Sequence, residues 1–205
     1  TLSVIKSYDE KLRNGTYPIT CKGIALAWHS EKDAGMYDAI NKGFAQATGN
    51  ICAYLNADDL YLPGAFATAA NIFIAYHDIE WLKGITAFCD EKGVISSSAP
   101  GYLYRRAWLQ KGVYGRSTYF VHQDSVFWRR SLWEKARPVI SSFRLAGDYA
   151  LWIAFAMYVP LWSFNTRVSA FRKRPGQLSA DMGAYRREQE RIAPHHFFLE
   201  KRVVL

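Results

Sequence analysis

The stretch ICAYLNADDLYLPG, residues 51–64, joins an apolar run to two adjacent carboxylates. Its first five residues are continuously apolar and of strand length, which indicates a buried strand. Asp58 and Asp59 follow directly, and Pro63-Gly64 then predicts a turn into a helix over Ala65–Tyr76. A strand, an acidic loop and a helix in this order are typical of an α/β fold, in which ligands bind beyond the carboxyl ends of the strands.

Further elements are predicted on both sides of this stretch. The predicted helices are Leu2–Leu12, Tyr37–Ala47, Ala65–Tyr76, Arg106–Lys111, Gly147–Tyr158 and the charged segment from Ala184 onward. The predicted strands are Ile24–Trp28, Ile51–Leu55, Trp81–Phe88, Gly93–Ile95, Tyr119–Val121, Val126–Trp128, Leu161–Phe164 and Val168–Arg172. Because strands and helices alternate through the first half, we expect α/β layers around a mostly parallel sheet. Since no linker or internal repeat interrupts the chain, we expect a single domain over residues 1–205.

The composition indicates a globular protein with a basic surface. Half of the 205 residues are hydrophobic, and 26 Lys+Arg against 18 Asp+Glu leave a net charge of +8. Such a surface favours anions such as phosphates, unless it is simply solvated. Three cysteines without CxxC spacing predict reduced thiols and a cytoplasmic location. Because no apolar segment reaches the roughly 18 residues of a membrane span, at most a peripheral contact with the inner face of the membrane is expected.

The carboxylate pair has two interpretations. Two hard oxygen ligands without His or Cys nearby suit Mg²⁺ or Mn²⁺, and such an ion would bridge Asp58 and Asp59 to a diphosphate. Alternatively, the aspartates organise the turn or cap the following helix.

Several motifs in order resemble the family 2 glycosyltransferases, which have the GT-A nucleotide-diphospho-sugar transferase fold. They are Ser30–Gly43 (SEKDAGMYDAINKG), Ala47–Asn50 (ATGN), Asn56–Asp59 (NADD), Gln123–Ala136 (QDSVFWRRSLWEKA) and Ala146–Trp152 (AGDYALW). The resemblance implies a three-layer α/β/α architecture and a catalytic core over about residues 1–180, followed by a basic helical tail over about 184–205. It also implies that the chain lacks the first strand and nucleotide-binding loop of the family.

The resemblance assigns donor and metal roles. Asp33 and Asn41 match positions that line the donor nucleotide pocket. Asn56 replaces the leading Asp of the family's D-x-D motif and is expected near the donor's ribose. Asp58 is expected to bind the donor, and both Asp58 and Asp59 are expected to bind the metal ion.

The resemblance also assigns the chemistry and the acceptor side. Asp148 matches the general base of inverting members, although a helix N-cap is the structural alternative. His122 and Gln123 are expected near the acceptor, and Trp152 either stacks on a sugar or belongs to the core.

A cationic segment follows the last predicted strand, where some family members place a metal-binding His. Here Arg172 and Arg174 are expected to hold the donor diphosphate instead.

The sequence therefore predicts a metal-dependent, inverting glycosyltransferase that moves a sugar from a nucleotide-diphosphate donor to a glycan or lipid-linked acceptor. A nucleotidyltransferase of similar fold and a basic nucleic-acid-binding domain are the alternatives. Because the sequence contains no recognition motif for nucleic acid, we do not expect nucleic acid as a partner. The tail over Tyr185–Val204 either lies on an anionic membrane or packs on its own domain.

Overall fold

The computed structural model describes residues 1–115, 119–136, 139–177 and 181–193. The chain forms two compact units, residues 1–34 and 35–205, and the single-domain organisation stays a prediction. In the first unit, Asp9 of α1 (Leu2–Arg13) accepts a hydrogen bond from Trp28 Nε1 at 3.2 Å. The segment Ile24–Trp28 has no regular secondary structure and pairs with no strand among the described residues, so the strand predicted there is wrong.

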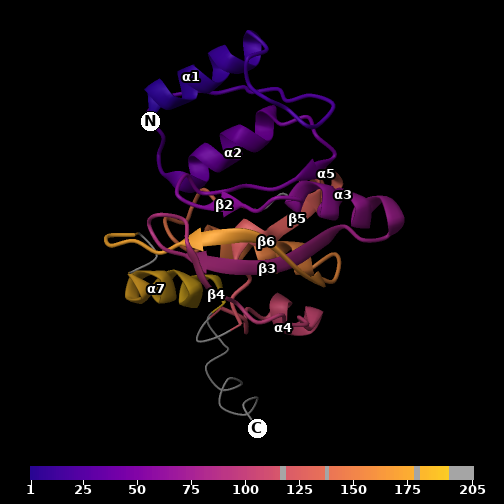
Figure 1. The fold of residues 1–205 in the computed structure, drawn as a ribbon. Helices are drawn as coiled ribbons and strands as arrows, with labels where there is room; N and C mark the ends of the chain where they lie inside the picture. The colour runs from indigo at the N-terminus through magenta and orange to yellow at the C-terminus, as the bar shows by residue number, and fades with distance from the viewer. Residues whose placement is uncertain (116–118, 137–138, 178–180, 194–205) are drawn as a thin grey trace. The chain divides into compact units, whose positions relative to one another are not determined.

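The second unit contains a six-stranded mixed sheet of order β1-β5-β3-β6-β2, with β4 paired to β3 (Figure 1). The strands are β1 (Ile51–Cys52), β2 (Leu60–Tyr61), β3 (Trp81–Cys89), β4 (Ile95–Ser98), β5 (Val126–Arg129) and β6 (Trp162–Arg172). Among the described residues, β3 and β6 are parallel, while the other four pairings are antiparallel. The α/β class is confirmed, but the prediction of a mostly parallel sheet is wrong. Alternation in sequence does not fix strand direction, and β5 inserts between β1 and β3 antiparallel to both.

The helices of the second unit lie close to their predicted positions, apart from the helix over Arg130–Ala136, which is not predicted from the sequence. They are α2 (Met36–Gln46), α3 (Ala65–Ala75), α4 (Arg106–Gln110), α5 (Arg130–Ala136), α6 (Gly147–Ala156) and α7 (Met182–Ile192), with a 3₁₀ turn η1 (Gln123–Ser125) before β5. The two strands predicted after α6 form one strand, β6, and Tyr119–Val121 forms none.

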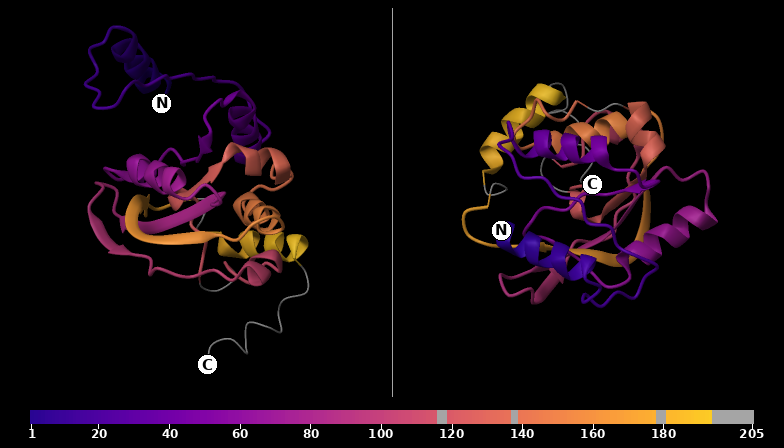
Figure 2. Two further views of the ribbon diagram at one scale, coloured as in Figure 1. Left: turned by 90° about the vertical axis from the view of Figure 1, so that its right-hand side faces the viewer. Right: turned by 90° about the horizontal axis from the view of Figure 1, so that it is seen from above.

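The sheet is covered on both faces, as Figure 2 shows for α3 and α6. Alternating residues of β5 point to opposite sides, because successive side chains of a strand do so. Phe127 packs in one cluster with Phe73 of α3, whereas Trp128 packs in another with Phe155 of α6. The three-layer arrangement expected from the sequence follows.

Gly147, the first residue of α6, makes room for the Tyr37 ring of α2. A Cβ atom at position 147 would lie 2.7 Å from three ring atoms of Tyr37. The ring is held in place because the Tyr37 hydroxyl donates to the Leu145 carbonyl at 3.0 Å and contacts Asp148. The start of α6 therefore depends on a residue without a side chain.

We expect Gly147→Ala to lower the free energy of unfolding by about 1–3 kcal/mol, because the added methyl group overpacks this contact. Urea denaturation measures the change. Gly43→Ala is the matched control, since Gly43 lies in α2 with open space around it and alanine there should stabilise by up to about 1 kcal/mol. Equal stability of Gly147→Ala and wild type would contradict the packing argument.

Candidate active site

The segment Asn56–Asp59 lies against the carboxyl end of β6. The backbone N–H of Arg172, the last residue of β6, donates to Asp59 Oδ1 at 3.0 Å, and Asn56 Nδ2 donates to Asp59 Oδ2 at 3.3 Å. Asp59 is 5% exposed. Burial raises the pKa of Asp59 to about 6, and the hydrogen bond from the Arg172 N–H partly offsets this rise. The negative charges of Asp124 and Asp58 raise the pKa further. Asp59 thus anchors the acidic loop to the sheet.

Asp58 has a different environment from its neighbour. Its side chain is 25% exposed, and Oδ2 accepts a hydrogen bond from Arg174 Nε at 2.8 Å. Burial opposes its charge, but this hydrogen bond holds the pKa of Asp58 below its ordinary value. An ionised, accessible carboxylate suits a hard cation better than the buried Asp59 does.

Within the described residues, no three or more His, Cys, Asp or Glu side chains gather as a metal cluster. Mg²⁺ often takes one or two carboxylates from the protein and its remaining ligands from water and substrate phosphates. Asp58 therefore fits an ion that arrives with a diphosphate.

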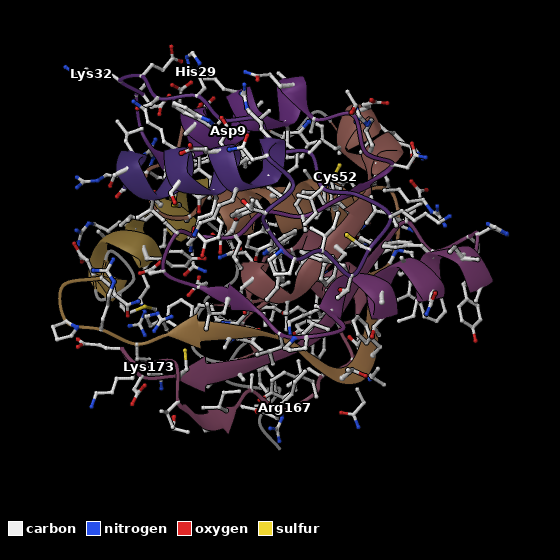
Figure 3. All side chains as sticks on the ribbon, turned by 45° about the horizontal axis from the view of Figure 1, so that its top comes forward. Asp9, His29, Lys32, Cys52, Arg167 and Lys173 are labelled. Atoms are coloured by element: carbon white, nitrogen blue, oxygen red, sulfur yellow. The ribbon has the colours of Figure 1, made fainter. Side chains whose placement is uncertain are left out.

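The two arginines after β6 have different contacts. Arg172 donates through Nε to the Asp58 carbonyl at 2.8 Å and through Nη1 to the carbonyls of Asp90 and Glu91. Its guanidinium group therefore ties the acidic loop to the β3–β4 turn. Arg174 is exposed and pairs with Asp58, so it is the better placed of the two for a diphosphate. Lys173, which is labelled in Figure 3, lies between them in the sequence. Its Nζ lies 4.5 Å from the ring centroid of Phe88.

Asp148 begins a second group of functional side chains, in the first turn of α6. Its Oδ1 accepts hydrogen bonds from the hydroxyls of Tyr37 at 3.2 Å and Tyr185 at 3.1 Å. Burial raises the pKa of Asp148 to about 6, while the backbone N–H of Tyr149 and the two hydroxyls oppose a larger rise. A carboxylate with such a pKa can accept a proton near neutral pH.

The helix α7 holds this group in place. The carboxylate of Glu188 accepts hydrogen bonds from the backbone N–H groups of Arg144, Leu145 and Ala146 at 3.0, 2.9 and 2.8 Å. Tyr185 of the same helix reaches Asp148. Residues 182–193 therefore agree with the packed alternative for the tail, and its residues from 194 lie outside the described residues.

Electrostatic contacts connect the two groups. Tyr54, two residues before Asn56, has its pKa raised by burial and by the charges of several neighbours, which include Asp148 and Asp124. Asp124 of η1 is 1% exposed, accepts a hydrogen bond from Ser169 Oγ of β6 and also raises the pKa of Asp59. Asp124 thus acts electrostatically on Asp59 of the acidic loop and, like Asp148, on Tyr54.

The residues predicted for the acceptor side have unequal positions. Trp152 is 4% exposed, stacks on Trp81 and donates Nε1 to the Val121 carbonyl at 3.1 Å, so it belongs to the core and the sugar-stacking alternative is wrong. His122 packs between the rings of Phe88 and Phe120. Burial and then the nearby charges of Lys83 and Lys173 lower the pKa of His122 to about 4, so the imidazole is neutral near pH 7.

Gln123 is buried, and its Oε1 has no hydrogen-bond partner among the described residues. Asn41 lies partly buried on α2, and Asp33 belongs to the first unit. The roles of His122, Gln123, Asn41 and Asp33 stay predictions.

Sequence reasoning missed Tyr37, Tyr185 and Glu188. Tyr37 lies inside a family motif, where its position predicts only the start of a helix. The other two lie in a charged tail segment with no motif of its own, and their spacing from Asp148 carries no signal in a single sequence.

Tyr185→Phe should move the acid limb of the activity profile upward by about one pH unit. The variant loses a hydrogen bond to the charged carboxylate of Asp148, which is worth roughly 1.5 kcal/mol, so the pKa of Asp148 rises. The pH dependence of kcat/KM measures this. Tyr158→Phe, at an exposed tyrosine after α6, is the control and should leave the profile in place. An unchanged acid limb in Tyr185→Phe would contradict the assignment.

A mixed α/β sheet with an acidic loop at the carboxyl end of β6 and a carboxylate at a helix start fits a GT-A-type fold. The sequence profile "Glycosyl transferase family 2" matches residues 4–135, and the chain belongs to this family. No curated protein matches the chain at a significant level.

Two solved structures share the fold. The crystal structure of S. aureus TarS 1-349 has 12% sequence identity and a TM-score of 0.58, and the match covers 84% of this chain and 47% of that one. The complex of TarS 1-349 with UDP-GlcNAc has 13% identity and a TM-score of 0.57, with coverages of 88% and 48%. This chain thus spans about half the length of the TarS chains that it matches.

Proposed function

We propose that the chain transfers a sugar from a nucleotide-diphosphate donor to a glycan or lipid-linked acceptor, with inversion at the anomeric carbon and with Mg²⁺ or Mn²⁺ bound at Asp58. Membership of glycosyl transferase family 2 and the fold shared with a UDP-GlcNAc-bound structure support the donor class. The observation that carries the proposal is Asp148, a carboxylate with a raised pKa whose Oδ1 accepts hydrogen bonds from two tyrosines.

Each residue has a defined task in this proposal. Asp148 accepts the proton of the acceptor hydroxyl, and the hydroxyl oxygen forms a bond to the anomeric carbon as the bond from that carbon to the diphosphate breaks. A divalent cation, when bound, neutralises charge on the departing diphosphate. Asp58 would hold this ion, with Asp59 and Arg172 fixing the loop and Arg174 contacting the diphosphate.

We also propose that the tail makes a peripheral contact with a membrane. Its apolar residues Phe197, Phe198, Leu199 and Val203 lie outside the described residues. No described helix is long and apolar enough to cross a membrane.

The experiment that tests the function is a donor screen. Nucleotide-diphospho-sugars are added with and without Mn²⁺, and thermal shift and release of the nucleoside diphosphate are measured. We expect at least one donor to stabilise the protein and to release its nucleoside diphosphate in a Mn²⁺-dependent manner. Arg174→Ala should weaken that donor about tenfold, as expected for a lost charge-assisted hydrogen bond. Absence of binding and release for every donor would overturn the proposal.

A further inference from the structure

An open cleft of about 540 Å³ lies between α7 and two loops, the one before α6 and the one after β6. Three arginines line it: Arg144 from the loop, and Arg187 and Arg191 from α7. All three are exposed. We call this feature the arginine cleft.

The acidic residues of the arginine cleft are occupied by backbone groups. Glu188 accepts three backbone N–H groups, and although burial opposes its charge, these hydrogen bonds lower its pKa, so it is ionised and engaged. Asp181 caps α7 by accepting the Ala184 N–H at 2.9 Å. Among the described residues, Arg144 and Arg187 take part in no ion pair. Their guanidinium groups are thus free to bind an anion, and the planar fork of arginine matches phosphate oxygens in pairs.

Two residues that line the arginine cleft connect it to the hydrogen-bond partners of the proposed base. Leu145 lines the cleft, and its carbonyl accepts the Tyr37 hydroxyl that also contacts Asp148. Ala184 lines it as well, and the next residue, Tyr185, reaches Asp148. The helix α7 packs on α6 through a small apolar cluster with Ala146 and Tyr149, which fixes this arrangement (Figure 2). The wall of the arginine cleft therefore includes a residue that bonds to Tyr37 and the residue before Tyr185, and these two tyrosines contact Asp148.

We propose that the arginine cleft binds a phosphate group of the acceptor, so that the substrate class is a phosphate-bearing glycan or lipid. The identification of the ligand as the acceptor rests on the proposed function. The phosphate-binding site itself does not depend on that function. Three guanidinium groups around one open cleft match the one or two negative charges of a phosphate ester better than a neutral sugar. The donor diphosphate has its own partners at the other group, in Asp58 with its ion and Arg174.

The test measures the affinity of the full chain for inorganic phosphate by isothermal titration calorimetry at low ionic strength with Mg²⁺ present. The titration is done once with saturating UDP and once without UDP. Arg187→Gln and Arg144→Gln should each weaken phosphate at least tenfold, the loss of one charge-assisted interaction. Arg186→Gln is the matched control, because Arg186 is the adjacent exposed arginine of α7 and does not line the cleft. Its phosphate affinity should stay within twofold of wild type, and thermal melting should show all three variants folded.

Three results would overturn the proposal. The first is unchanged phosphate affinity in both cleft variants. The second is an equal loss of phosphate affinity in Arg186→Gln, which would indicate diffuse surface charge. The third is a loss of UDP affinity instead of phosphate affinity in the cleft variants, which would assign the cleft to the donor. Failure of UDP to bind wild type would count against the proposed function and not against the phosphate site. A soluble sugar phosphate and vesicles that carry a polyprenyl phosphate separate the two acceptor sources. Binding of either ligand that depends on Arg187 supports the proposal. If neither ligand shows binding that depends on Arg187, the proposal is overturned.

Discussion

Asp148→Asn lowers sugar transfer by about 10³-fold and leaves donor affinity within twofold of wild type. A positioned general base contributes about 10²–10⁴-fold to a rate, and the amide of Asn cannot accept the hydroxyl proton. The amide oxygen can still accept the hydrogen bonds of Tyr37 and Tyr185, so the fold at the start of α6 is kept. Transfer is measured by acceptor labelling, and donor affinity by titration with the nucleoside diphosphate and Mn²⁺.

The pH dependence of the wild-type enzyme gives a second check on Asp148. Burial raises the pKa of its carboxyl group to about 6, so the base is protonated and inactive below that pH. We expect kcat/KM to fall tenfold per pH unit below about pH 6 and to level off above it. Asp78→Asn, at an exposed position after α3, is the control and should change neither rate nor profile. Full transfer by Asp148→Asn would remove the base assignment.

Asp58→Asn should weaken Mn²⁺-supported donor binding by about 100-fold, roughly 2.7 kcal/mol, and should make the remaining binding independent of the metal. The substitution removes the accessible charged oxygen ligand, while the loop stays anchored through Asp59. Titration with UDP in the presence of Mn²⁺ and then of EDTA measures both effects without relying on turnover.

Asp59→Asn is the comparison for this prediction. Asp59 is buried and accepts the Arg172 N–H, so its replacement should lower the melting temperature, whereas Asp58→Asn should not. Unchanged Mn²⁺ dependence in Asp58→Asn would show that the ion is held elsewhere.

Much of the local structure could be predicted from the sequence. The helices over residues 36–46 and 65–75 and the strand over 81–89 follow from apolar periodicity and from the turn residues around them, which act within a few positions of the chain. Family motifs also led to Asp58 and Asp148, because those residues lie within recognisable segments.

Strand direction and partners could not be predicted in the same way. Ile24–Trp28 has the composition of a strand, yet a strand exists only where another chain segment completes its hydrogen bonds. Trp152 could have faced a sugar or the core, and packing against Trp81 decided for the core.

The sequence by itself determined the α/β class, the family and the two carboxylates on which the proposed chemistry depends. The tertiary structure decided which aspartate of the pair is accessible, because Asp59 is buried against the end of β6, where it accepts the Arg172 N–H, while Asp58 stays partly exposed. It also brought Tyr37 and Tyr185 to one oxygen of Asp148 from positions 111 and 37 residues away. Such contacts depend on how α2, α6 and α7 pack, and packing is a property of the whole chain that no local pattern records.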